Sequence, residues 1–267
     1  MEYYFICPKC ATPLTLQGKS YVCENGHCYD LAKSGYVNLV LANQKNSAEA
    51  GDNKEMIEAR KIVMEGGYYQ KLADDIINSL TKQNPKSILD AGCGIGYIPY
   101  RLYQAFPDAK ILGADISKEA ILAASKKYKN IPFAVASSIR LPLKSNSIDA
   151  LICAFAPVYP AEFCRVLTDN GLFLRVIPDK RHLFKLKELL YETPYENELD
   201  PLEIEGFTYI DTISSKKEIT ASGDYLHSII KMTPYYYHSR KSDIERLLNV
   251  GETAVNLDFA VRIYQKS

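Results

Sequence analysis

An aspartate followed by three glycines at alternate positions, Asp90 to Gly96, is the stretch best suited to binding a small molecule. The apolar residues before Asp90 predict a buried strand, and the apolar-periodic residues 97–106 predict a helix. Glycines allow the strand to turn sharply into the helix while the backbone lies against a ligand. A dinucleotide-binding loop needs G-x-G-x-x-G, whereas this loop reads G-x-G-x-G and lacks an evident phosphate cradle.

A second acidic residue, Asp115, ends the next apolar run, residues 110–115. A carboxylate at the tip of a second parallel strand can accept hydrogen bonds from both hydroxyls of a ribose. With this pair of acids the stretch resembles the class I S-adenosylmethionine-dependent methyltransferases. The resemblance implies that the glycine loop takes the methionine end of the cofactor and Asp115 its ribose. A dehydrogenase or an α/β turn that binds no ligand are the alternatives.

The first forty residues carry metal-binding spacing: Cys7 and Cys10, then Cys23 followed by His27 and Cys28. Each pair brings two ligands to one side, and a short hairpin between the pairs would close a tetrahedral zinc site. Spacing leaves the fourth ligand open between His27 and Cys28. Buried free thiols are the alternative, but so small a segment lacks a core and needs a staple. Four protein ligands leave no place for a catalytic water, so the zinc is predicted to be structural.

Composition sets broad limits on the protein class. The 267 residues are 47% hydrophobic, which is enough for one large domain and a small one. There is no run of 18 apolar residues, and the first residues lack a basic region, so we expect a cytoplasmic protein without a membrane partner. Seven cysteines, an odd number, favour reduced thiols over disulfides. Lys and Arg balance Asp and Glu at 32 each, so charge does not reveal a nucleic-acid partner.

Further motifs carry a more specific resemblance: D-L-A-K-S-G-Y-V-N-L at 30–39, G-D-N-K-E-M-I-E-A-R at 51–60 and P-D-K-R-H-L at 178–183. Together with the cysteine motif they resemble the RlmA family of 23S rRNA guanine-N1 methyltransferases, also called RrmA, with TlrB in a macrolide producer. The resemblance implies the zinc ligands Cys7, Cys10, Cys23 and His27. It also implies a homodimer, and an enzyme that methylates N1 of a loop guanine in a 23S rRNA hairpin near the peptide exit tunnel, a modification associated with macrolide resistance.

The resemblance implies a cofactor site as well. Its residues are Tyr69, Asp90, Gly92, Cys93, Gly94, Ile95, Gly96, Tyr97, Asp115, Ser137 and His182. Guanine N1 must lose a proton. The resemblance does not settle which residue takes it, and His182 and Asp52 are the candidates. The acceptor should lie at residues 154–157, after the strand 147–153. That loop lacks the Asn/Asp-Pro-Pro-aromatic sequence of enzymes that methylate exocyclic amines, which disfavours adenine N6 chemistry.

The predicted fold is α/β, a Rossmann-like class I methyltransferase sheet, mostly parallel with an antiparallel last strand at 255–264. We expect a zinc-binding RNA-recognition module at 1–40, a linker and helices at 41–82, and the catalytic domain at 83–267. Helices are predicted over 54–65 and from 68–70 to about 81. A helix end and a turn are predicted over 165–171, and the fifth strand over 172–177. A small-molecule methyltransferase and a non-catalytic zinc-ribbon RNA-binding protein remain alternatives; the zinc motif disfavours the first, and the intact acids and glycines disfavour the second.

Overall fold

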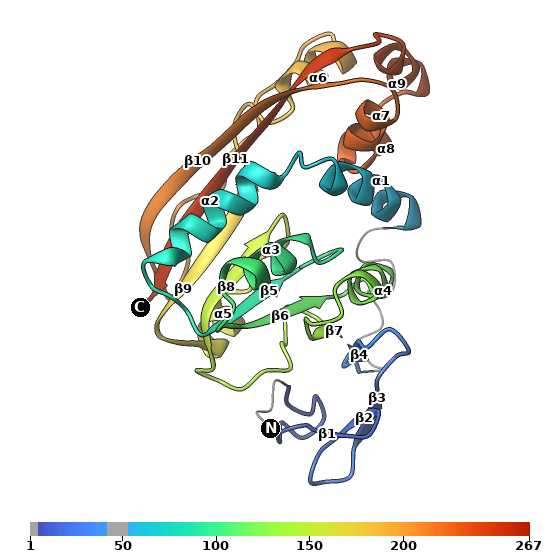
Figure 1. The fold of residues 1–267 in the computed structure, drawn as a ribbon. Coiled ribbons are helices and arrows are strands. Elements are labelled where there is room, and N and C mark those ends of the chain that lie inside the picture. The colour runs from blue at the N-terminus through green and yellow to red at the C-terminus, as the bar shows by residue number, and fades with distance from the viewer. Residues whose placement is uncertain (1–4, 42–52) are drawn as a thin grey trace.

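A computed structural model, which describes residues 5–41 and 53–267, places an eight-stranded mixed sheet at the centre of the protein (Figure 1). The strand order is β10-β11-β9-β8-β5-β6-β7-β4. The strands are β4 Val37–Asn38, β5 Ser87–Ala91, β6 Lys110–Asp115, β7 Phe133–Val135, β8 Ile148–Ala154, β9 Leu167–Pro178, β10 Phe207–Ala221 and β11 Thr253–Lys266. Strands β9, β11 and β10 pair antiparallel, and the other neighbours pair parallel. The predicted Rossmann-like fold is confirmed.

Helices pack around this sheet. They are α1 Lys54–Glu65, α2 Gln70–Thr81, α3 Tyr97–Ala105, α4 Lys118–Lys127, α5 Pro160–Val166, α6 Phe184–Leu190, α7 Gly223–Lys231, α8 Pro234–His238 and α9 Lys241–Leu248. The side chain of Asn53 caps α1 by accepting a hydrogen bond from the Met56 N–H, and Ser117 caps α4 in the same way. The predicted helix over 54–65 is confirmed. Among the described residues, no helix has the length and apolar character to span a membrane.

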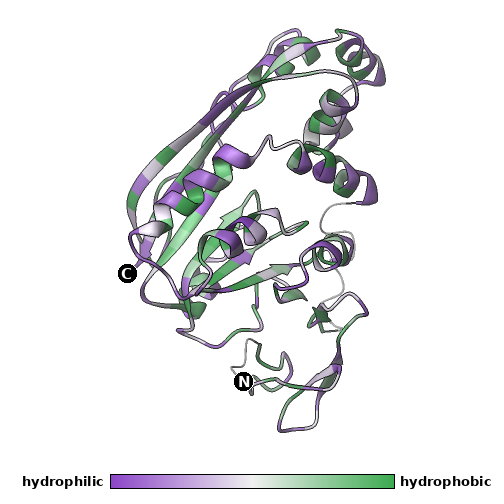
Figure 2. Ribbon diagram, in the orientation of Figure 1, coloured by the Kyte–Doolittle hydropathy of each residue, from purple (hydrophilic) through white to green (hydrophobic). Residues whose placement is uncertain are grey.

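The central strands are buried on both faces, as a parallel sheet covered by helices requires. Neighbouring residues of β5 show this, because Ile88 and Leu89 are both fully buried but belong to two different apolar clusters. Successive side chains of a strand point to opposite faces, so the sheet separates two cores. The apolar colour of the central strands in Figure 2 follows this arrangement. The carboxyl ends of β5, β6 and β8 are therefore held in place by packing on both faces of the sheet.

Two features of the sheet differ from the sequence prediction. The antiparallel last strand is confirmed as β11, but it pairs along its whole length with β10, which the sequence analysis did not predict. Strand β10 is an edge strand with mostly exposed residues, so its sequence has no continuous apolar pattern. The second difference is that β9 begins at Leu167, inside the predicted turn. The predicted turn corresponds to a break in the register of β9, because its pairing with β8 passes from Leu167 directly to Leu172.

The N-terminal segment forms a small three-stranded sheet of β1 Thr15–Gln17, β2 Ser20–Val22 and β3 Cys28–Asp30. It docks on the loop after β7, where the Ile6 N–H donates to the Pro142 carbonyl over 2.9 Å and Phe5 shares an apolar cluster with Leu141. The segment continues into β4, which pairs with β7 in the large sheet. The three-part division at residues 40 and 82 stays a prediction. Residues 42–52 of the predicted linker and helices at 41–82 lie outside the described residues.

Candidate active site and metal centre

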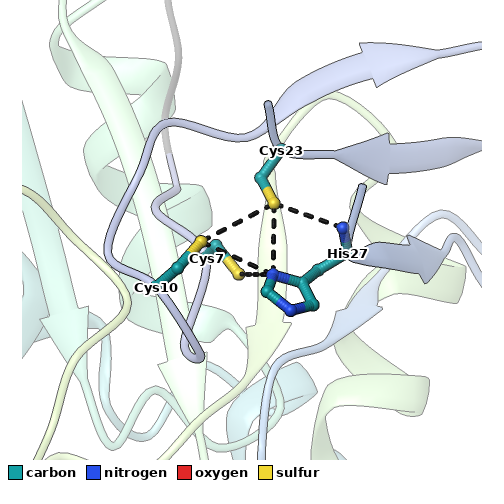
Figure 3. Close-up of side chains that lie close together, drawn as sticks. All are labelled: Cys7, Cys10, Cys23 and His27. Carbon is teal, nitrogen blue, oxygen red and sulfur yellow. Dashed lines mark hydrogen bonds between the residues drawn. The ribbon is translucent and has the colours of Figure 1, made fainter. Parts of the chain in front are cut away.

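The predicted metal ligands Cys7, Cys10, Cys23 and His27 converge in one cluster, with ligand atoms all within 4.8 Å of one another (Figure 3). The His27 Nδ1 atom lies 3.4–3.5 Å from each of the three Sγ atoms, and the Sγ atoms of Cys10 and Cys23 are 3.7 Å apart. A zinc–sulfur bond of about 2.3 Å gives a tetrahedral edge near 3.8 Å. The donors and their spacing thus fit a structural zinc ion. The neighbouring Cys28 is exposed and belongs to β3 instead.

Hydroxyl groups around the cluster hold the thiols in place. The Tyr29 hydroxyl lies 3.3 Å from the Cys7 Sγ, and the Thr12 hydroxyl lies 3.2 Å from the Cys10 Sγ. Hydrogen bonds from the side chains of Thr12 and Asn25 lower the pKa of Cys10 to about 5. Zinc binds the thiolate form, so these contacts prepare the site for the metal and orient its ligands.

The glycine loop that follows β5 needs glycine at each position for a separate reason. Gly92, Gly94 and Gly96 all have positive φ angles, of 92°, 53° and 78°. A Cβ on Gly92 would lie 2.7 Å from the Cβ of Ala156, and one on Gly96 would lie 2.8 Å from the Phe133 ring. A Cβ on Gly94 would instead project into open space, which leaves that backbone accessible to a ligand.

Two adjoining cavities open at the carboxyl edge of the sheet. The inner cavity reaches from Tyr69 to Asp90, and the outer cavity, of about 320 Å³, reaches from Asp115 to Ser137. Of the predicted cofactor residues, the inner cavity is lined by Tyr69, Asp90, Gly92, Cys93, Gly94, Ile95 and Tyr97, and the outer one by Gly92, Gly94, Asp115 and Ser137. Gly96 lines neither cavity, because it packs against the Phe133 ring.

The two acidic residues occupy different electrostatic environments. Asp115 accepts hydrogen bonds of 2.8 Å from the N–H groups of Gly94 and Ser117, one to each oxygen. Asp90 is buried, and its Oδ1 has no hydrogen-bond partner within the described part of the chain. Burial, reinforced by the charge of Asp115, raises the pKa of Asp90 to about 8. The inner cavity is therefore lined by a buried carboxyl group whose Oδ1 has no hydrogen-bond partner among residues 5–41 and 53–267.

The structure does not bring His182 to either cavity. Its ring is buried 4.6 Å, centroid to centroid, from the Phe259 ring, and Phe259 in turn packs on Tyr69 and Phe155 of the inner cavity. Burial, with a smaller effect of the Lys187 charge, lowers the pKa of His182 to about 3. His182 thus lies one layer behind the site and is a weak base, contrary to the expectation that it reaches the cofactor. The other candidate base, Asp52, lies outside the described residues.

Two residues at the site received no role in the sequence analysis. Arg60 of α1 and Phe155, which follows β8, each line both cavities. Phe155 has a φ angle of 57°, a strained value for a bulky residue, and its side chain is 39% exposed. Arg60 belonged to a recognised motif and Phe155 to the expected acceptor loop. Nothing in the sequence indicated that they come together.

Comparison with known proteins agrees with this geometry. Residues 82–232 match the model of a methyltransferase domain, and the chain is thus a methyltransferase of the S-adenosylmethionine-dependent class. Residues 5–48 match the zinc ribbon described as RlmA, N-terminal. The chain is 32% identical to YxjB of Bacillus subtilis, whose name assigns it as a 23S rRNA (guanine-N1)-methyltransferase, over 98% of this chain and 97% of that one. It belongs to the RlmA family of 23S rRNA guanine-N1 methyltransferases.

A second relative covers the chain to a similar extent. The 23S rRNA (guanine(748)-N1)-methyltransferase of Streptomyces fradiae is 28% identical over 97% of this chain and 96% of its own length. Both matches run through the zinc ribbon and the cofactor loop.

The residues present fit the cofactor that the family implies. The buried carboxyl of Asp90 can pair with the α-ammonium group of S-adenosylmethionine, and the open face of Gly94 leaves room for the ligand beside the backbone. Asp115 lines the outer cavity, and its carboxylate oxygens are of the acceptor type that two ribose hydroxyls need. These three residues would hold the cofactor across both cavities.

The zinc cluster gives a first testable prediction. Replacing Cys7 with serine removes one of four ligands, so we expect loss of bound zinc and a fall in melting temperature of more than about 5 °C. The matched control is Cys28→Ser, which removes an exposed thiol next to His27 and should leave both properties unchanged. Metal analysis should find about one zinc per wild-type chain. Zinc loss in the Cys28→Ser protein would contradict the assignment of the fourth ligand.

Asp90 gives a second prediction. Its folded pKa, about 8, lies above the ordinary value near 3.9, so between these pH values the folded protein holds a proton that the unfolded chain releases. The stability from this proton is full below about pH 4 and is lost as pH rises through 8. We therefore expect Asp90→Asn to raise the melting temperature of ligand-free protein by about 3 °C or more at pH 8.5, with a smaller rise at pH 5.

The same variant should bind S-adenosylmethionine at least about tenfold more weakly, because a neutral amide replaces a charge-assisted hydrogen bond. Scanning calorimetry at both pH values and binding calorimetry measure the two effects. Asp108→Asn, at an exposed carboxyl, serves as the control. Equal melting-temperature shifts at pH 5 and pH 8.5 would show that Asp90 is not the titrating group.

Proposed function

We propose that this chain transfers a methyl group from S-adenosylmethionine to N1 of a loop guanine in a 23S rRNA hairpin near the peptide exit tunnel. The proposal is carried by full-length likeness to two relatives named as 23S rRNA guanine-N1 methyltransferases, through both the zinc ribbon and the cofactor loop. A likeness confined to residues 82–232 would support a methyltransferase without indicating its acceptor.

The chemistry asks little of the protein beyond positioning. The sulfonium group of the bound cofactor supplies an already activated methyl. The chain must hold the acceptor nitrogen in line with it, and orientation of this kind supplies much of the rate acceleration. Guanine N1 lies on the Watson–Crick edge, so the target base must be unpaired or turned out of its helix. An acceptor site at the open carboxyl edge of the sheet is accessible to such a base.

The place of the zinc ribbon favours an RNA substrate. The ribbon docks on residues 141–143, only a few residues after Ser137 and Ile139 of the outer cavity. A module at that position can bind RNA beside the outer cavity, whereas a small-molecule acceptor needs no second recognition element. For this reason we favour rRNA over a quinone-type or other small-molecule acceptor. The unpaired Asp90 carboxyl in an open cavity argues against a non-catalytic RNA-binding protein.

The reaction can be tested by primer extension. Unmodified 23S rRNA is incubated with the protein and S-adenosylmethionine, and reverse transcriptase is run through the product. A methyl on guanine N1 blocks base pairing, so we expect a new stop one nucleotide before the target, dependent on the cofactor. An Asp115→Ala protein serves as the negative control, because it lacks the proposed ribose ligand. Cofactor binding without a stop on rRNA would favour the small-molecule alternative.

We propose, in addition, that the protein acts in the cytoplasm as a homodimer. We also propose that the methyl group it adds to 23S rRNA affects macrolide susceptibility. Edge strand β10 supports self-association, since none of the described strands pairs with its outer edge and Tyr209 and Ile210 are exposed there. Light scattering on a sizing column should give twice the 30.1 kDa chain mass. A Tyr209→Lys, Ile210→Lys double variant should shift that mass toward the monomer if the edge forms the interface, and a wild-type monomer would refute the dimer.

A further inference from the structure

The junction between the two cavities is the part of the site nearest the chemistry. If the α-ammonium group binds Asp90 in the inner cavity and the ribose binds Asp115 in the outer one, the sulfonium of the cofactor would lie where the cavities meet. Arg60 and Phe155 line both cavities and are therefore beside that point. The inference below rests on the proposed function and concerns how the acceptor base is held there.

The backbone at Phe155 is strained but is held by a hydrogen bond, and it places the residue beside the junction of the two cavities. Its φ angle of 57° turns the chain sharply after β8, and its N–H donates to the Val176 carbonyl of β9 over 3.0 Å. The ring is supported by Tyr69 edge-on at 6.3 Å and by Phe259 at 5.3 Å, and the residue as a whole is 39% exposed. An exposed aromatic residue that lines a site can provide a platform on which an unpaired base stacks.

Arg60 brings a positive charge to the same point. It projects from α1, and its charge acts on the hydroxyl of Tyr69 at the inner end of the site. During the reaction guanine becomes anionic, because loss of the N1 proton places negative charge on O6. Arginine is also the side chain that pairs best with guanine O6 and N7.

We propose that Phe155 and Arg60 form the guanine subsite, with the base stacked on the Phe155 ring and the Arg60 guanidinium donating hydrogen bonds to O6. Arg60 stabilises the deprotonated base and so promotes the loss of the N1 proton to water. As the N1–carbon bond forms, the sulfur–carbon bond breaks and leaves a neutral thioether, so charge and atoms balance. No carboxylate or histidine base is then required at the site.

The competing role for Arg60 is pairing with the carboxylate of the cofactor, since Arg60 also lines the inner cavity. The two roles differ in what they predict for cofactor binding. Arg60→Gln removes the charge and Arg60→Lys keeps it with fewer donors, while Lys61→Gln, at a surface lysine paired with Glu58, is the matched control. Binding calorimetry gives the dissociation constant of S-adenosylmethionine, and methylation of the target hairpin is followed from pH 6 to 10.

For Arg60→Gln we expect a fall in kcat of about a hundredfold at pH 7, a rate that continues to rise at alkaline pH after the wild-type rate has levelled, and an unchanged cofactor dissociation constant. The kcat of Arg60→Lys should lie between those of the wild type and Arg60→Gln, and the kcat of Lys61→Gln should match that of the wild type. Phe155→Leu should raise the KM for RNA about tenfold and leave the pH profile unchanged.

A tenfold loss of cofactor affinity in Arg60→Gln, or a pH profile identical to that of the wild type, would overturn the guanine subsite. If Arg60→Gln does not fold, the same criteria apply to Arg60→Lys. Failure of the proposed function is a different result, because the wild-type protein itself would then leave rRNA unmodified.

Discussion

The site depends on one close approach, between the loop after β5 and the loop after β8. A side chain at Gly92 would collide with Ala156, so these two loops are in contact only because that residue is glycine. Parallel pairing of β5 with β8 brings both loops to the same sheet edge, and burial of these strands on both faces keeps the edge rigid. Backbone packing thus sets the separation between the glycine loop and the loop after β8.

The zinc ribbon is tied to the same frame through helix α5. Glu162 and Arg165 of α5 form an ion pair at 2.6 Å, and together they bind the backbone of Leu141 and Leu143. Between those residues, the Pro142 carbonyl accepts the hydrogen bond from Ile6 of the ribbon. Since α5 begins just after the loop that follows β8, these hydrogen bonds connect that loop to the ribbon over a short distance. RNA bound by the ribbon would therefore be held at a fixed position relative to that loop.

The sequence was sufficient for features whose cause is local. The glycine loop, the two strand-terminal acids and the cysteine pairs could be predicted because spacing along the chain fixes their geometry, and the helix over 54–65 because its cap and period are local as well. Strand β10 could not, because an exposed edge strand is stabilised by its pairing with β11 and not by its own pattern. His182 was misplaced for a similar reason: its motif was recognisable, but Phe259, from the far end of the chain, separates it from the cavity.

Two unfavourable features of the described structure lie beside the cavities where the cofactor and its acceptor would meet. Asp90 buries a carboxyl without a partner, and Phe155 holds a strained backbone angle, whereas Asp115 is fully supported by N–H groups. A fold selected for stability alone would replace both residues, because an amide at 90 and a glycine at 155 relieve these costs. Their presence is explained when the missing partners are supplied by ligands: an ammonium group for Asp90 and an unpaired base for Phe155. Binding of the cofactor would then supply a partner for the buried Asp90 carboxyl.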